Sequence, residues 1–303
     1  CMQVLCREKI LDEDFYEGRL NVYSFVHSSA QNMLYGLVPA AKRPALHDRA
    51  GFLSAEYYLA SGRDNPKKLA LHFLRARNKE EGVRHGLAAA KVYADEFQPR
   101  KAVETYLDVL SLLQDGSSQQ RDHIQCDLAR VYMDLGEFSR ALDLLVPIAE
   151  ARLTSKQKPS PTPILVAVAR CYTRLGDFAK ARNYLKEGIA VERQQILPVW
   201  MFHLLLASAD LSAALGGHEE SISFCEKILK SRDQIHDKKL LLQVYCRLVE
   251  SHRAQDSVEK AMLCCQEALQ LSDAQAADKK FLDSFFFIMG SFYACKDKFA
   301  KAL

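Results

Sequence analysis

The stretch ARCYTRLGDFAKA, residues 169–181, decides the fold because its spacing of residue types occurs again elsewhere in the chain. Two segments align with it without gaps: Ala129–Tyr132–Gly136–Phe138–Ala141 and Gly290–Tyr293–Asp297–Phe299–Ala302. Fainter copies place Ala102, Ser221 and Ala261 at the position of Ala181. The six equivalent positions, 102, 141, 181, 221, 261 and 302, are 39, 40, 40, 40 and 41 residues apart. A spacing kept five times indicates an internal repeat.

Each copy has the residue pattern of two packed helices. In the quoted copy, Ala169 comes three residues before Tyr172, which places both on one face of a first helix. The small residue lets a second helix approach closely, and the aromatic ring fills the space beside it. Gly176 is expected to end the first helix in the left-handed conformation. The second helix then carries Ala181 at the crossing point and Leu185 one turn later, so the pattern predicts stacked helical hairpins.

This pattern resembles the tetratricopeptide repeat, which has a small residue and a tyrosine on helix A, a glycine at the turn and an alanine on helix B. That family has a period of about 34 residues, so the chain is similar to long-period members such as MalT regulators and kinesin light chains. The resemblance covers residues 84–303 and implies an all-α, right-handed superhelical solenoid of five repeats and a truncated sixth. The fourth copy departs most, with Ser212 replacing the tyrosine and Ser221 the alanine.

Residues 1–83 follow a different pattern. The segment 21–27 alternates apolar and polar residues, which predicts a short strand. Helices are expected over 28–37, 43–61 and 66–78, with Pro39 separating the first two. A strand followed by compact helices is consistent with the end of a small α/β winged-helix domain. The predicted organisation is a partial winged-helix-like domain over 1–62, a connecting helix over 63–83 and repeats over 84–303.

The same region carries recognisable motifs. They are Tyr23–x–Phe25–x–His27, Leu34–Tyr35–x–Leu37, Arg43–x–x–Leu46–His47 and Leu69–Ala70–x–His72–Phe73. These motifs resemble the segment that joins the NTPase module to helical repeats in STAND-type signalling ATPases, a layout shared with MalT-like regulators, some bacterial kinases and soluble-type adenylyl cyclases. The resemblance implies the sensor or scaffold part of a multidomain switch, with its catalytic domains upstream in the same polypeptide. Because the sequence begins Cys1–Met2 and stops within a repeat, we expect a piece of a longer protein.

Composition argues against several classes of partner. A net charge of +3 over 303 residues gives no bulk attraction for nucleic acid or for a membrane surface. No apolar stretch approaches the roughly 18 residues of a membrane span. The nine cysteines form no C-x-x-C pair, and most occupy apolar positions of helical patterns. A reducing compartment is expected, and therefore the cytoplasm.

Catalytic motifs are not found in the sequence. It contains no P-loop, no G-x-G-x-x-G, no H-E-x-x-H and no G-x-S-x-G. The histidines have no metal-ligand spacing, and the adjacent Cys264 and Cys265 diverge by about 100° on a helix, so they cannot share a metal locally. We therefore expect no metal, no cofactor and no catalysis in this chain.

Binding is expected on the concave face. In the resembled family the residue after the small residue of helix A points into the groove; here these residues are Lys91, Arg130, Arg170, Asp210, Glu250 and Ser291. Arg84, Arg174 and Arg253 extend the set. The first three are basic and the next two acidic, which predicts a groove split by sign that orients a partner peptide or protein. The alternative is a small-molecule sensor controlling the upstream domain.

One linker offers modification sites. The segment 155–163 contains Pro159, Pro161 and Pro163, which exclude a helix through it. Ser160 and Thr162 each precede a proline, so kinase modification is possible at both. The alternative interpretation is a plain exposed loop.

Overall fold

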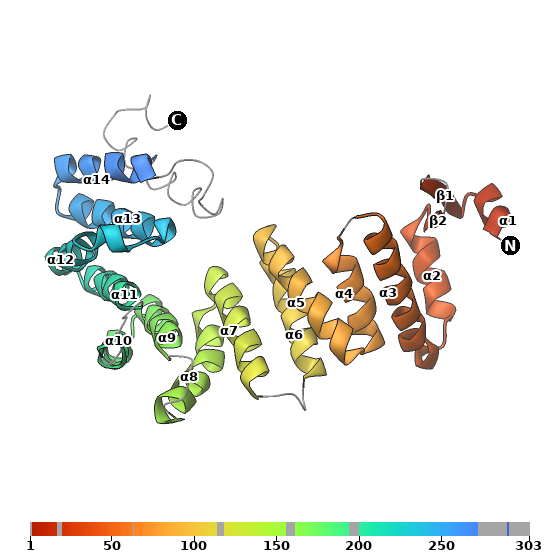
Figure 1. Ribbon diagram of the computed structural model, residues 1–303, viewed down its shortest axis with the longest axis horizontal. Helices are drawn as coiled ribbons and strands as arrows, with labels where there is room; N and C mark the ends of the chain where they lie inside the picture. Colours follow the sequence, from red (N-terminus) through yellow and green to blue (C-terminus); the bar gives the residue numbers. More distant parts are fainter. Residues whose placement is uncertain are drawn as a thin grey trace. The chain divides into compact units, whose positions relative to one another are not determined.

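The computed structural model describes residues 2–16, 20–62, 64–113, 118–155, 161–193, 200–271 and 290 (Figure 1). The chain divides into two compact units, residues 1–121 and 122–303. No helix within the described ranges is long and apolar enough to cross a membrane.

The first unit opens with a β-hairpin. A short helix, α1 (Met2–Arg7), precedes the antiparallel strands β1 (Leu11–Tyr16) and β2 (Leu20–Phe25), which pair from Leu11 with Phe25 to Tyr16 with Leu20. Strand β2 confirms the strand expected near 21–27. Its partner β1 was not expected, because the acidic run Asp12–Asp14 hides the alternation of apolar residues. The winged-helix assignment stays a prediction.

Helices follow from residue 28 onward in this unit. They are α2 (Ser28–Leu37), the 3-10 turn η1 (Ala40–Lys42), α3 (Arg43–Ala60), α4 (Pro66–Ala76), α5 (Lys79–Asp95) and α6 (Pro99–Leu112). Each helix from α3 to α6 packs on the next. The expected helices over 28–37, 43–61 and 66–78 are therefore present. The division expected between residues 83 and 84 falls inside α5, because Asn78 caps that helix and starts it earlier.

The second unit is a succession of helical hairpins. It contains α7 (Ser118–Asp134, beginning just before the division), α8 (Phe138–Ser155), α9 (Thr162–Leu175), α10 (Phe178–Glu192), α11 (Met201–Ala214), α12 (His218–Leu229), η2 (Arg232–Gln234), α13 (Lys238–Ala254) and α14 (Val258–Leu271). From α8 to α14 each helix packs on the next, and α11 also contacts α9 and α13 (Figure 1). Apart from Gly290, the sixth copy of the repeat and Ser291 lie outside the described residues.

One turn joins the two helices of every described repeat. Its left-handed residue is Phe97, Gly136, Gly176, Gly216 or Asp256, with φ of 59°, 76°, 81°, 79° and 57°. The following amide bonds back into the first helix, as Asp177 N donates to Tyr172 O at 3.0 Å. This is the helix-ending motif for which glycine is favoured. Gly136 and Gly176 confirm the expected helix ends, while Phe97 and Asp256 adopt the same conformation without glycine.

The crossing points confirm the role of the small residues. Ala90, Ala129, Ala169 and Ala209 on the first helices are fully buried, and so are their counterparts on the second helices, Ala102, Ala141, Ala181, Ser221 and Ala261. A larger side chain at these positions would push the helices apart, because protein interiors are already close-packed. The periodic small residues thus set the separation of the two helices in each hairpin.

The fourth repeat has hydrogen bonds where the third repeat has the contacts of its tyrosine and alanine. In the third repeat, Lys180 lies 5.2 Å from the ring centre of Tyr172. The equivalent pair in the fourth repeat is Ser212 and Glu220, whose hydroxyl and carboxylate bond at 2.9 Å. Ser221, at the alanine position, bonds through its hydroxyl to Ser251 at 3.2 Å. Both departures from the pattern are therefore compensated, because each buried hydroxyl has a partner.

Candidate functional site

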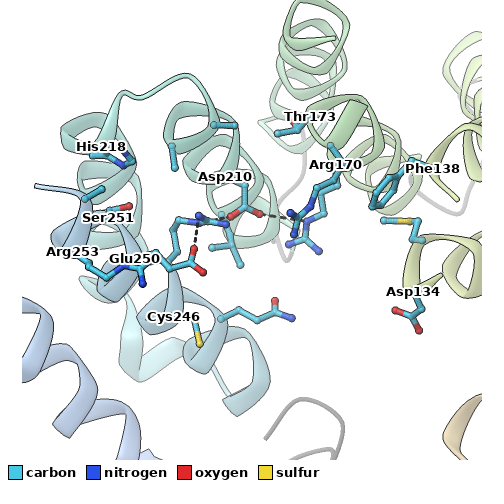
Figure 2. Close-up of a pocket in the computed structure, with 18 residues that line it drawn as sticks. Asp134, Phe138, Arg170, Thr173, Asp210, His218, Cys246, Glu250, Ser251 and Arg253 are labelled. Atoms are coloured by element: carbon cyan, nitrogen blue, oxygen red, sulfur yellow. Dashed lines mark hydrogen bonds and ion pairs between the residues drawn. The ribbon is translucent and has the colours of Figure 1, made fainter. Parts of the chain in front are cut away.

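A cavity of about 780 Å³ lies within the second unit (Figure 2). We call it the repeat cavity. The first helices α9, α11 and α13 supply most of its wall, and the α7–α8 turn and the start of α12 supply the rest. Its lining residues are Met133, Asp134, Phe138, Arg170, Thr173, Arg174, Leu206, Asp210, Ala213, Ala214, His218, Gln243, Cys246, Arg247, Glu250, Ser251, Arg253 and Ala254.

A ladder of alternating charges crosses one wall of the cavity. Arg247 on α13 donates from Nε to Asp210 Oδ1 of α11 at 2.7 Å, and from Nη1 to Glu250 Oε2 on its own helix at 2.7 Å. The other oxygen of Asp210 lies 4.0 Å from Arg170 Nε on α9. The order Arg170, Asp210, Glu250 can be followed across Figure 2. One guanidinium therefore bonds to two carboxylates and offsets one of their two negative charges, and a second guanidinium lies nearby.

The electrostatics of the ladder keep Arg247 charged. Burial alone would lower the pKa of Arg247, but the carboxylates of Asp210 and Glu250 together raise it above its ordinary value. Arg170 is held less tightly, because 4.0 Å is too long for a hydrogen bond. Its Nε is buried and has no hydrogen-bond partner. The same is true of Nδ1 in His218, on the α12 side of the cavity.

Two further arginines of the cavity are exposed. Arg174 stands one turn after Arg170 on α9, and Arg253 lies in the last turn of α13. Neither forms an ion pair with any residue in the described ranges. The cavity is therefore lined by four arginines and three carboxylates, and the positive charge without a protein partner is on Arg174 and Arg253.

The structure brings five of the predicted groove residues together. Arg170, Arg174, Asp210, Glu250 and Arg253 all line the repeat cavity. The expected split by sign is modified within it, because both acidic residues bond to Arg247, whose positive charge offsets one of their two negative charges. The face expected to be acidic thus keeps at most one unit of negative charge at these positions, and Arg170 lies 4.0 Å from Asp210.

The remaining predicted groove residues lie elsewhere. Arg130 on α7 is exposed and pairs with Asp127, one turn earlier, at 3.0 Å. Arg84 on α5 is exposed and pairs with Glu81. Lys91 is exposed on the same helix. None of the three lines the repeat cavity.

Sequence reasoning missed Arg247. It occupies the position three residues before Glu250, so the two share one face of α13. The spacing of opposite charges at i and i+3 was visible in the sequence, as it was for Asp127 and Arg130. What the sequence could not show is that Arg247 also reaches Asp210, 37 residues away on another helix.

Of the two expected modification sites, Ser160 and Thr162, the structure describes one. Ser160 lies outside the described residues. Thr162 opens α9 and is fully buried. Because a kinase must reach the hydroxyl, the burial of Thr162 argues against its modification in the folded protein, and the proline pattern that suggested it instead marks the start of a helix.

Four described cysteines have thiols that are poorly suited to nucleophilic chemistry. Burial raises the pKa of the Cys171 thiol to about 11, and burial with the nearby Asp210 raises that of Cys225 to about 12. The adjacent Cys264 and Cys265 also have raised pKa values, about 11 and about 12, with burial as the main cause. Near neutral pH these thiols stay protonated and are poor nucleophiles. Within the described ranges, no group of three or more histidine, cysteine or carboxylate side chains could hold a metal ion.

Sequence comparison identifies one repeat directly. The model of the tetratricopeptide repeat matches residues 162–195, which contain α9 and α10. In this copy the alanine, tyrosine, glycine and second alanine all occur, as Ala169, Tyr172, Gly176 and Ala181. No curated protein matches the chain in sequence.

Solved structures establish the fold at low sequence identity. A tetratricopeptide repeat protein from Parabacteroides merdae is 14% identical, with a TM-score of 0.59 over 85% of this chain and 90% of that chain. A Rap protein complexed with competence and sporulation factor is 13% identical, with a TM-score of 0.64 over 89% and 83%. A STAND protein with a tetratricopeptide repeat sensor from Pyrococcus horikoshii is 17% identical, with a TM-score of 0.51 over 99% and 44%. The fold is therefore an all-α solenoid of the tetratricopeptide type.

Proposed function

We propose that the chain is a non-catalytic interaction module that binds a segment of a partner protein in the repeat cavity. The observation that carries the proposal is the cavity itself, whose wall is formed by one residue position repeated on successive first helices: Arg170, Asp210 and Glu250. A solenoid uses its recurrent small residues for packing, which leaves such positions available for a ligand. Arg84, Lys91 and Arg130 remain candidates for contacts outside the cavity.

A larger signalling protein is the proposed setting. The motifs of residues 21–80 and the likeness to a STAND protein with a repeat sensor support a sensor region that controls upstream domains of the same polypeptide. The proposed location is the cytoplasm, where buried thiols such as Cys171 and Cys225 stay reduced. Nucleic acid and membranes are not among the proposed partners.

A small molecule is the second candidate ligand. A volume of about 780 Å³ lies within the roughly 300–1,000 Å³ of small-molecule pockets. Such pockets are predominantly apolar, with few polar groups. Seven charged side chains line this one, and that favours a polar protein segment.

Blocking the cavity tests the proposal. Peptides selected on the wild-type chain from a random library displayed on phage should lose binding to Ala214→Trp, because Ala214 lines the cavity and is exposed at the end of α11. The matched control is Ala179→Trp, at an exposed position of α10 that does not line the cavity. Peptides that bind both variants as well as the wild type would contradict the proposed site. If no peptides are enriched while a metabolite library raises the melting temperature of the wild type and not of Ala214→Trp, the small-molecule alternative is correct.

A further inference from the structure

The four arginines of the repeat cavity differ in how closely they are paired with carboxylates of the protein. Arg247 is already paired with protein carboxylates, because it donates two hydrogen bonds of 2.7 Å, one to Asp210 and one to Glu250. Arg170 is only partly engaged, at 4.0 Å from Asp210 and without a hydrogen bond from Nε. Arg174 and Arg253 have no ion pair in the described part of the chain. Three of the four arginines can therefore accept an anion without displacing a strong protein contact.

The arginines without a strong protein contact lie at both ends of the ladder of charges. Arg170 and Arg174 stand one turn apart on α9, so their like charges repel each other unless an anion lies between them. Arg253 lies beyond Glu250 at the α13 end, on the opposite side of Asp210 from Arg170 (Figure 2). An occupant with negative groups at two points would meet Arg170 and Arg174 at one end and Arg253 at the other, and the carboxylates between them are bonded to Arg247.

The rest of the wall sets the shape of the occupant. The large apolar residues of the lining are Met133, Phe138 and Leu206, and Figure 2 shows Phe138 on the Arg170 side of the cavity. Apolar contact of this kind suits a side chain flanking the charged group. Guanidinium groups favour planar oxyanions, which they bind through two parallel hydrogen bonds.

We propose that the repeat cavity binds an acidic protein segment, with one carboxylate held by Arg170 and Arg174, an apolar neighbour against Met133 and Phe138, and a second carboxylate at Arg253. This inference rests on the proposed function and adds the chemical class of the ligand. A phosphorylated side chain offers the same oxyanion chemistry, so the experiment must separate the two sources.

Library selection gives the first readout. Peptides recovered on the wild-type chain should be enriched in aspartate and glutamate, with an apolar residue beside at least one of them. The most enriched peptide is then synthesised with glutamate, glutamine or phosphoserine at the acidic position beside the apolar residue. Its binding to the protein is titrated by fluorescence anisotropy. The glutamine form should bind the wild type roughly 10- to 100-fold more weakly, the effect of removing a charge-assisted hydrogen bond.

Exposed arginines provide matched variants. Arg174→Gln and Arg253→Gln should each weaken binding of the glutamate peptide, whereas Arg182→Gln, at an exposed arginine of α10 outside the cavity, should leave its affinity unchanged. The difference in affinity between the glutamate and glutamine peptides should become smaller on the Arg174→Gln variant, because one of the two arginines that hold the carboxylate is removed. Circular dichroism confirms that each variant is folded.

The outcomes distinguish the two proposals. Peptides that bind in the cavity without enrichment in acidic residues, or a glutamine form that binds as well as the glutamate form, would overturn the acidic ligand and leave the proposed function standing. A phosphoserine form that binds more than tenfold tighter than the glutamate form overturns the carboxylate assignment in favour of a phosphorylated segment. Failure to recover any peptide overturns the acidic ligand together with the proposed function.

Discussion

Helices α2 and α11 are both rich in apolar residues, yet they are packed in opposite ways. Helix α11 buries seven of its residues, and Leu204 is fully inaccessible. Helix α2 buries none, and Met33 and Leu37 are 71% and 72% exposed. The difference follows from their neighbours, because α11 contacts α9, α10, α12 and α13 within the repeat stack. Helix α2 contacts β2, and its Tyr35 forms a hydrogen bond with His47 of α3.

Apolar content does not by itself place a helix in a core. In a repeat array each hairpin buries its apolar side against the next copy, so burial depends on having neighbours on both sides. Within the described residues of the first unit, α2 is not enclosed by helices on both sides as α11 is in the second. Changes in the two helices should therefore have unequal consequences.

The largest effect is expected from truncating a leucine in each helix. Leu204→Ala removes a buried side chain packed with Val166, Leu185 and Leu211, and should lower the free energy of unfolding by about 2–5 kcal/mol. Leu37→Ala should change it by less than about 0.5 kcal/mol, because Leu37 is exposed. Urea denaturation followed by circular dichroism measures both. An equal loss in the two variants would show that α2 is covered in the protein.

A smaller effect is expected at the repeat turns, where three positions have glycine and two do not. Gly216→Ala should destabilise the second unit by about 1 kcal/mol, since its φ of 79° is unfavourable for any side chain. Phe97→Gly and Asp256→Gly should instead stabilise by up to about 1 kcal/mol, because both residues adopt the left-handed conformation at a cost. The aspartate should gain less than the phenylalanine, as aspartate tolerates this region better.

Thermal denaturation of the three variants separates these expectations. The melting temperature should fall for Gly216→Ala and rise for the two glycine variants. A fall in all three would mean that the exposed ring of Phe97 and the side chain of Asp256 stabilise their turns by contacts that outweigh the backbone strain.

The smallest effect concerns the polar attachment of α2. The Tyr35 hydroxyl lies 3.0 Å from His47 Nε2, and His47 Nδ1 lies 3.2 Å from His72 Nδ1 on α4. Burial, with Arg75, lowers the pKa of His47; burial, with His47, Lys68 and Arg75, lowers the pKa of His72. Both values lie below the ordinary 6.5.

The sign of the pH effect follows from these shifts. At His47 and His72 the unfolded chain binds protons more readily than the folded one. The stability that the two neutral histidines contribute is therefore complete above pH 6.5 and is lost as the pH falls through their lower pKa values in the folded protein. Hydrogen-exchange protection of α2 should therefore decrease between pH 7 and pH 5, and should decrease less in His72→Gln. The exposed His27→Gln serves as the control. Equal pH dependence in the wild type and His72→Gln would show that the histidine pair does not hold α2.

Much of the fold was predictable because it depends on local spacing. Ala181 and Ser221 were placed at crossing points from the period alone, and both are fully buried. Strand β1 was missed because its acidic residues mask the alternation. In the candidate site, Arg170, Asp210 and Glu250 were expected to share one face and do line one cavity. The partner-binding role of that cavity stays a prediction.

The sequence by itself determined the repeat, the helix ends and the residues at the helix crossings, because a helix has a fixed period and each copy restates it. Only the tertiary structure decided that Arg247 bridges Asp210 and Glu250, and hence that the cavity has spare positive charge. The reason is physical: an ion pair between helices depends on their separation and rotation to within an ångström, and residue spacing along one helix specifies neither.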